Sequence, residues 1–337
     1  MAILKRLSYI LPTALMLTGC YHEFTPEVDT KPVLCMNSLI TAGEPIEVEL
    51  THTWLYSDQN ADCRVSDARV SLYANDVEVA SDYIPREGDR IRIVASSRAY
   101  GNAEAEVTVP YAVEAKVLES RPDHARVGCY ESNGLLTADV TFDMNFALAI
   151  DDPAGADNYY LYECMGYSSF DGEWPDYTDY YEDISYFNTG IFRYEAEPIF
   201  AEHIDVLESV TGSDAFGFTF FTDRQFQGSR YTLNLMYSGA TAHITADAGD
   251  LQSVPECGFE ICLYSVSASY YNWANYCWQV DSGLLGEVGD VGLGDPLQAY
   301  SNVSTGAGVV AARSAAVYRI DMSDFLREAL EQALKKE

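Results

Sequence analysis

The chain has 337 residues, of which 52 are acidic and 20 are basic, so its formal net charge is −32. A surface this acidic repels phosphate backbones, and we therefore predict no nucleic-acid partner. Hydrophobic residues make up 48% of the sequence, which excludes a wholly disordered chain and is ample for packed cores. The length suits two domains rather than one.

The first twenty residues carry the pattern of an export signal. Lys5 and Arg6 supply a positive start, and residues 7–17 form an apolar segment too short to span a bilayer, which needs about 20 residues. The sequence Leu-Thr-Gly-Cys at 17–20 resembles the lipobox of bacterial lipoproteins. That resemblance implies cleavage before Cys20, with lipid added to its sulfur and to its new amino group.

We therefore predict a lipoprotein signal peptide over residues 1–19, lipidation at Cys20 and a polar tether over residues 20–31. Several acyl chains anchor a protein stably where one would be marginal. No other stretch reaches 18 consecutive apolar residues, so the mature protein would be held at the membrane by lipid alone. The alternative is an ordinary secretory signal with a chance cysteine at its end.

Residues 32–110 have the pattern of a small β-sandwich built from short strands. Residues 33–40 form a mostly apolar run, and apolar residues alternate with polar ones over 46–51, as in a half-buried strand. Asn75 and Asp76 lie between two apolar stretches and predict a tight hairpin turn. The remaining strands are expected at 70–74, 77–79, 91–93 and 104–109.

Residues 111–322 are predicted to form a larger β-rich domain with a few helices. Its clearest strand is the alternating run at 135–150. Residues 267–280 have apolar positions near a helical period and predict a helix, and a shorter helix is expected at 199–208. The other strands are expected at 112–119, 157–162, 216–221, 231–237 and 259–266.

Residues 323–337 predict an amphipathic C-terminal helix. Asp321 or Ser323 can cap its start. Lys335 and Lys336 complement the helix dipole at its end. One face carries Leu326, Leu330, Ala333 and Leu334. The predicted fold class is all-β and mainly antiparallel, with this helix as the last element.

Seven cysteines remain once Cys20 is acylated, an odd number that leaves at least one thiol without a disulfide partner. Cys257 and Cys262 are five apart, an offset that puts them on opposite faces of a strand and argues against direct pairing. No CxxC pair or Cys/His cluster indicates a metal site. The seven are Cys35, Cys63, Cys129, Cys164, Cys257, Cys262 and Cys277.

One local composition stands out between residues 170 and 187, where six acidic residues interleave with seven aromatic ones. Aromatic faces stack on sugars or receive a cation, and carboxylates are the hard ligands that Ca²⁺ prefers. The spacing does not match an EF-hand loop, so no cofactor is predicted and Ca²⁺ is the alternative. The candidate ligand-binding residues are Asp171, Trp174, Asp176, Tyr177, Asp179, Tyr180 and Tyr181. The competing interpretation is a solvated acidic loop whose aromatic residues pack on the sheet.

Catalytic motifs are missing from the sequence. The five histidines lack a metal-ligand spacing, and there is no nucleophile elbow or phosphate-cradling loop. His243 with Asp247 and Asp250 could be sketched as a site, but a surface turn explains this grouping better. We therefore predict that the protein is not an enzyme and has no catalytic or metal-binding residues, with a hydrolase as the less favoured alternative.

Several motifs, in chain order, resemble a family of Bacteroidota outer-membrane lipoproteins catalogued as domain of unknown function 4249. They are the lipobox, Ala68–Leu72, Ala103–Pro110, Asp157–Tyr160, Phe221–Gly228, Tyr270-Tyr271, Asp295-Pro296, Tyr300–Val303 and Gly306–Val310. Together they span nearly the whole mature chain. Two departures are Ala307, where a bulkier residue is usual, and the number of cysteines.

The resemblance implies an immunoglobulin-like front domain, a larger β-rich back domain and a TonB-dependent outer-membrane transporter as a partner. It supplies no catalytic residues, and the glycines of 306–308 are better explained by turn geometry than by ligand binding. The predicted function is a lipid-anchored, non-catalytic outer-membrane lipoprotein that captures a small ligand, glycan or peptide for a TonB-dependent uptake system or serves as its accessory subunit. The sequence leaves open whether it faces the cell surface or the periplasm. The alternative is a structural or adhesive surface lipoprotein.

Overall fold

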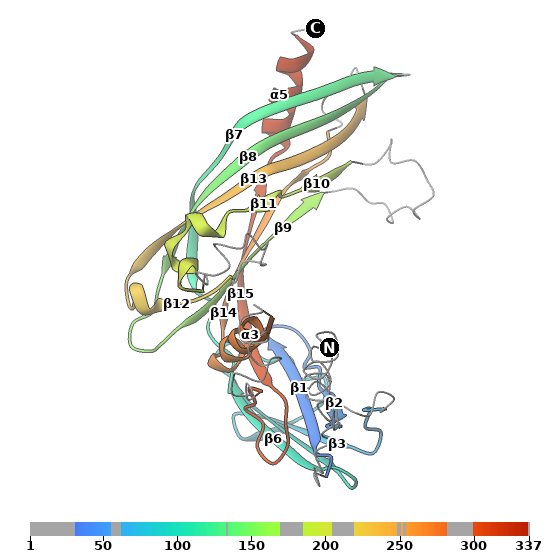
Figure 1. Ribbon diagram of the computed structural model, residues 1–337, viewed down its shortest axis with the longest axis vertical. Coiled ribbons are helices and arrows are strands. Elements are labelled where there is room, and N and C mark those ends of the chain that lie inside the picture. The colour runs from blue at the N-terminus through green and yellow to red at the C-terminus, as the bar shows by residue number, and fades with distance from the viewer. Residues whose placement is uncertain are drawn as a thin grey trace, which may run out of the picture. The chain divides into compact units, whose positions relative to one another are not determined.

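The computed structural model describes residues 31–54, 62–132, 134–168, 185–203, 219–247, 251, 254–281 and 299–335. This part of the chain is mostly antiparallel β-sheet, which confirms the predicted all-β class (Figure 1). The signal peptide, Cys20 and most of the tether lie outside the described residues. Among the helices that are described, none combines the length and the apolar character needed to cross a membrane.

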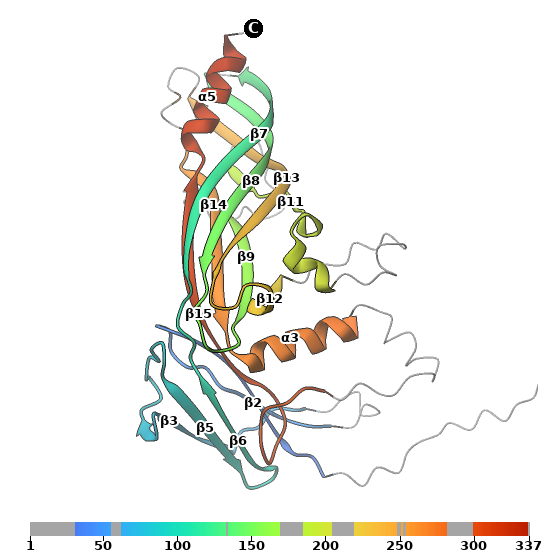
Figure 2. The same cartoon turned by 90° about the vertical axis from the view of Figure 1, so that its left-hand side faces the viewer.

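Six strands form the first sheet, in the order β12-β9-β14-β15-β1-β2 (Figures 1 and 2). Its neighbours are antiparallel except β1 and β15, which pair in parallel with Ser38 opposite Val310. The strands are β1 (Leu34–Thr41), β2 (Glu49–His52), β9 (Tyr159–Ser168), β12 (Phe220–Thr222), β14 (Cys257–Val266) and β15 (Val310–Asp321).

Strand β15 has different partners along its length. Residues 310–313 lie beside β1, whereas residues 313–321 lie beside β14. Because β1 belongs to one hydrophobic core and most of β14 to another, this single strand contributes to both cores.

The front sandwich packs β1 and β2 against a four-stranded sheet in the order β4-β3-β5-β6. The strands of that sheet are β3 (Arg69–Ala74), β4 (Val77–Val79), β5 (Arg90–Ser97) and β6 (Gly101–Thr108). The core of the front sandwich contains alternate residues of both sheets, among them Leu34 and Met36 of β1, Ile91 and Ile93 of β5, and Val107 of β6. Val303, Val310 and Ala312 belong to the same core, although the sequence pattern placed them in the second region. The immunoglobulin-like assignment stays a prediction.

The predicted hairpin between β3 and β4 is confirmed. Asn75 has a φ of 52° and Asp76 a φ of 68°, the left-handed values that a two-residue I′ turn requires. Asn and Asp adopt this region more readily than other residues with a side chain. Leu72 consequently lies opposite Val79 across the turn.

The back sandwich faces the six-stranded sheet with five strands in the order β10-β13-β8-β7, with β11 also on β13. These are β7 (Glu114–Ser132), β8 (Leu135–Asp151), β10 (Tyr186–Asn188), β11 (Ile191–Phe192) and β13 (Arg230–Asp247). Phe259 of β14 lies near the middle of the second core, where its ring centroid is 5.1 Å from that of Phe146 and 4.9 Å from that of Phe187.

Helix α5 (Ser323–Leu334) confirms the predicted C-terminal helix. Neither predicted cap occupies the N-cap position, which is Met322 and has no side-chain cap bond. Asp321, one residue earlier, still accepts the backbone N–H of Ser323 on its Oδ1 at 2.8 Å. Leu326 and Leu330 are fully buried in the second core, whereas Leu334 is 36% exposed. The first turns of α5 therefore pack their apolar side chains against the second core, whereas its last turn is partly exposed.

The described part also contains three short 3₁₀ helices, η2 (Tyr194–Ala196), η3 (Pro198–His203) and η4 (Asp223–Gln225), and the helix α3 (Ala268–Asp281). The helix expected at 199–208 corresponds to η3, and residues 204–208 lie outside the described part. Glu197 before η3 is 1% exposed, and its carboxylate accepts the Tyr231 hydroxyl at 2.6 Å and the Asn234 N–H at 2.6 Å.

Two motifs that carried the family resemblance meet in space. Asn158, which directly precedes β9, donates its backbone N–H to Asp223 Oδ2 at 3.0 Å, and Asp223 is 1% exposed. Asp152 accepts the Tyr160 hydroxyl and, at 2.7 Å, the Gly228 N–H. Because buried carboxylates need such donors, these motif residues have a structural role in joining two loops.

The seven cysteines that follow Cys20 are all described, and none of them forms a disulfide. Cys257 and Cys262 both lie in β14, where their odd offset puts them on opposite faces as predicted. Cys257 packs into the second core, and Cys262 does not.

Brief alkylation of the reduced native protein at pH 8 should spare Cys257. Burial, together with the negative charges of Asp321 and Glu256, raises the pKa of its thiol to about 12, so roughly one molecule in ten thousand carries the reactive thiolate. Cys129, which is only partly buried on β7, is the internal reference. Peptide mass spectrometry gives the two rates, and equal rates without urea would contradict the buried placement.

Candidate functional site

Helix α3 (Ala268–Asp281) confirms the helix predicted at 267–280 and presents polar side chains on one face. Spacings of three and four residues place these side chains on the same side of the helix. The opposite side contacts β15 and β9, and Ala274 on that side is 7% exposed. The polar residues are Asn272, Asn275, Tyr276 and Gln279.

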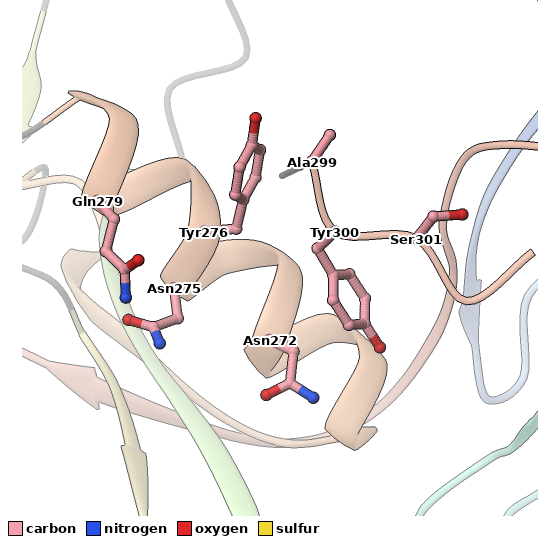
Figure 3. Close-up of a pocket in the computed structure, with 7 residues that line it drawn as sticks. All are labelled: Asn272, Asn275, Tyr276, Gln279, Ala299, Tyr300 and Ser301. Carbon is pink, nitrogen blue, oxygen red and sulfur yellow. The ribbon is translucent and has the colours of Figure 1, made fainter. Parts of the chain in front are cut away.

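A pocket of about 440 Å³ lies between this helix face and the segment 299–301 (Figure 3). Figure 3 shows the Tyr300 ring reaching from the segment toward the helix, at the level of Asn272. This volume is within the range of small-ligand sites. The pocket is lined by Asn272, Asn275, Tyr276, Gln279, Ala299, Tyr300 and Ser301.

Both walls of the pocket are hydrogen-bonded to the backbone of Val310. On the helix side, Ser269 Oγ donates to the Val310 carbonyl oxygen at 2.9 Å. On the other side, Asn302 Nδ2 donates to the same oxygen at 2.8 Å, and Asn302 Oδ1 accepts the Val310 N–H at 2.9 Å. Val310 is the first residue of β15 and pairs with β1 in the six-stranded sheet. Both walls of the pocket are therefore held in position by hydrogen bonds to the same residue of the sheet.

Two further serines fix the ends of these walls. Ser267 Oγ accepts the N–H of Tyr270 at 3.3 Å, which caps the start of α3, and it also accepts the N–H of Ala312 at 3.0 Å. Ser301 Oγ donates to the Gly308 carbonyl oxygen at 2.8 Å. The pocket is therefore preorganised by bonds that do not involve the side chains of Asn272 and Asn275.

The lining has no formally charged side chain. It contains three carboxamides, two phenols and one aliphatic hydroxyl, and the hydroxyl, that of Ser301, donates to the Gly308 carbonyl oxygen. Within the described residues, the side chains of Asn272, Asn275, Tyr276 and Tyr300 have no hydrogen-bond partner. Four groups that can both donate and accept therefore face the hollow.

A second hollow, of about 290 Å³, lies against the five-stranded sheet and η2. It differs from the first because it contains opposite charges, with Arg121 Nη1 4.0 Å from Glu119 Oε1. Asn145 supplies an amide that has no hydrogen-bond partner among the described residues. The other lining residues are Phe146, Ala147, Ala196, Asn234, Leu235 and Met236.

Asn302→Ala should lower the free energy of unfolding by about 2–3 kcal/mol, because it removes two hydrogen bonds and leaves the Val310 N–H unpaired. Asn302→Asp keeps the acceptor and should lose about half as much. Urea denaturation with an unchanged m-value measures both losses. Asn145→Ala, the matched control, should stay within about 0.5 kcal/mol of the parent. Similar losses at Asn302 and Asn145 would contradict the tie to Val310.

The ligand-binding residues predicted between Asp171 and Tyr181 lie outside the described residues, so their role stays a prediction. The end of that segment is described. Phe187 packs into the second core against Phe259, and Tyr186 stacks on the His243 ring at 5.1 Å. These two aromatic residues support the sheet.

His243 has a partner that sequence spacing did not indicate. Its Nδ1 lies 2.7 Å from Oδ1 of Asp139, which is opposite it in the register of β13 and β8. Asp250 lies outside the described residues. Within the described ranges, no group of three or more His, Cys, Asp or Glu residues is arranged to hold a metal ion.

The α3 pocket was not among the sites predicted from the sequence. The available signal is the run of amides and aromatic residues at helical spacing after Tyr270-Tyr271, a pattern that by itself predicts only a helix. The second wall could not be assigned to the helix because the pairing of 299–301 with α3 depends on β15.

Comparison with known proteins gives one match. A family model described as "Domain of unknown function (DUF4249)" matches residues 21–319, which is most of the chain. No curated protein and no solved structure matches the chain. The resemblance that the motifs indicated is confirmed at the level of the family.

Proposed function

We propose, from the premise that the chain belongs to the family described as "Domain of unknown function (DUF4249)", that it is a lipid-anchored, non-catalytic outer-membrane lipoprotein. It would capture a ligand for a TonB-dependent nutrient uptake system or form part of that system. The lipobox ending at Cys20 supports the anchor, and the immunoglobulin-like front domain belongs to the same proposal.

The α3 pocket is the observation that carries the capture role. Its two walls are helix α3 and the segment 299–301, and both are bonded to Val310. A preorganised site binds with a smaller entropic penalty than one that must be ordered by the ligand. The seven lining residues include no carboxylate, histidine or thiol, the groups that most general acid–base chemistry uses. Binding without turnover is the function that suits such a lining.

Co-purification tests the proposed complex. The full chain with a C-terminal affinity tag is extracted from membranes in mild detergent, and mass spectrometry identifies what accompanies it. A large TonB-dependent transporter in near-stoichiometric amount is the expected result. Recovery of the protein alone would sink the transporter role.

Cys20→Ala is the control for the anchor. This variant should leave the membrane pellet and should no longer bring down the transporter, because the acyl chains are lost. A Cys20→Ala protein that still sediments with membranes would show that lipid on this cysteine is not the anchor.

The acidic and aromatic segment is the proposed surface for contact with the ligand or the transporter. Because Phe187 is packed against Phe259, a deletion through residue 187 would damage the core. Replacing Asp171, Asp176 and Asp179 by Asn is the gentler test. Unchanged ligand uptake in that variant would remove this surface from the proposal.

A further inference from the structure

We infer that the α3 pocket binds a neutral saccharide. This inference rests on the proposed capture role and gives that role a ligand class. It depends on three features of the described residues: the hydrogen-bonding character of the lining, the absence of formal charge in it, and the fixed spacing of its walls.

The amide and phenol groups that line the pocket can both donate hydrogen bonds to hydroxyl groups and accept hydrogen bonds from them. A carboxamide offers two donor hydrogens and an acceptor oxygen, and a phenol offers one donor and an acceptor. A sugar hydroxyl likewise donates and accepts, so one ring can pair with several of these groups at once. Asn272 and Asn275 lie one turn apart on the helix, and neither amide is engaged by the described residues. Their spacing allows both amides to reach the same ligand.

The two tyrosines supply apolar ring faces beside the amides. Tyr276 extends from the helix and Tyr300 from the opposite segment (Figure 3). A saccharide ring has an apolar C–H face as well as a hydroxyl rim, so it can use a phenol ring and an amide together. A ligand without an apolar face would leave the ring surfaces unused.

The charge of the chain and the uncharged lining of the pocket favour a neutral saccharide over a charged ligand. The chain has a formal net charge of −32, which disfavours the approach of an anion. A bound anion would also require a guanidinium or an ammonium group, and none lines this pocket. A cation would require a carboxylate, and none lines it either. The second hollow, with Arg121 and Glu119, shows the contrast.

A peptide fits this pocket less well than a saccharide. Peptides are recognised by pairing with a sheet edge, by an apolar groove, by an aromatic channel for polyproline, or by charged groups that hold a terminus. The α3 pocket is formed by a helix face and the segment 299–301, and four of its seven lining side chains are amides or serine. It presents none of those four arrangements.

Titration calorimetry on the full-length protein in mild detergent tests the inference. The probes are maltohexaose, cellohexaose, xylohexaose and mannohexaose, with hexagalacturonate as the acidic counterpart and an end-blocked Ser/Asn hexapeptide as the peptide counterpart. At least one neutral hexasaccharide should bind, and the acidic sugar and the peptide should bind at least tenfold more weakly. Binding of none of the four, or comparable binding of either counterpart, would overturn the inference.

Two variants assign the binding to the pocket. Asn272→Ala/Asn275→Ala should weaken the saccharide at least tenfold, because two amide partners are lost. If that variant fails to fold by circular dichroism, Asn272→Asp/Asn275→Asp keeps the side-chain volume and removes the donors. Asn145→Ala in the second hollow should stay within twofold of the parent. Unchanged affinity in the folded helix variant would place the saccharide elsewhere and overturn the assignment.

The saccharide inference and the transporter proposal can be refuted independently of each other. The Asn272→Ala/Asn275→Ala variant keeps Cys20 and should still co-purify with the transporter. Co-purification without any saccharide binding would leave the proposed complex standing and remove only the ligand class. Saccharide binding without co-purification would support the ligand class and remove the proposed complex.

Discussion

Gly308→Ala should destabilise the protein by more than about 4 kcal/mol, a large part of the 5–15 kcal/mol by which folded domains are usually stable. Gly308 has a φ of +112°, and an added Cβ would lie well inside van der Waals contact with the Met36 carbonyl oxygen. The backbone cannot withdraw easily, because the Met36 N–H is bonded to the Ala307 carbonyl oxygen at 2.9 Å. Urea unfolding followed by near-ultraviolet circular dichroism measures the loss.

Gly43→Ala is the matched control. Gly43 also has a positive φ, +83°, but a Cβ there would meet no atom within 4 Å. The substitution should therefore show only the backbone penalty, about 1–2 kcal/mol. Equal losses at the two glycines would mean that the close approach of residues 36 and 308 does not contribute.

Phe259→Ala should lower the free energy of unfolding by about 3–5 kcal/mol through a cavity in the second core. The side chain is fully buried, and its ring meets Phe146, Phe187 and Tyr237 from three strands of the opposite sheet. Phe259→Leu keeps most of the volume and should lose less than about 1.5 kcal/mol. Thermal or urea unfolding of the two variants gives the comparison.

Val317→Ala tests whether that loss comes from burial. Val317 lies on the neighbouring strand β15 and is 52% exposed, so its truncation should change stability by no more than about 0.5 kcal/mol. A loss at Val317 as large as that at Phe259 would contradict the placement of the core between the two sheets.

Local patterns in the sequence predicted local structure well. The turn at Asn75 and Asp76 depends on two residues that tolerate positive φ, and α5 depends on an apolar stripe and a nearby cap. The opposite faces of Cys257 and Cys262 follow from strand alternation alone. Each of these predictions needs only interactions between residues close in the chain.

Long-range pairings could not be predicted in the same way. Asp139 and His243 are 104 positions apart, and no pattern in either segment indicates the other. The pocket has a related property, since among the described residues its helix and its second segment both bond to Val310, a residue that belongs to neither wall. The acidic and aromatic stretch stands out by its composition and so predicts a candidate site, whereas amides at helical spacing carry a weaker compositional signal.

The parallel pairing of β1 with β15 sets the order in which this protein can finish folding. The two strands are 272 positions apart, as the Arg313–Thr41 contact shows. At ribosomal speeds of about 5–20 residues per second, roughly 15 to 50 seconds separate the synthesis of one strand from that of its neighbour. During that interval the newly made β1 has an open edge, which is a template for wrong partners. A fragment that stops after Pro110 keeps this edge open and lacks Val303, Val310 and Ala312 of the front core, so we expect it to be less stable than the full chain and more prone to aggregate.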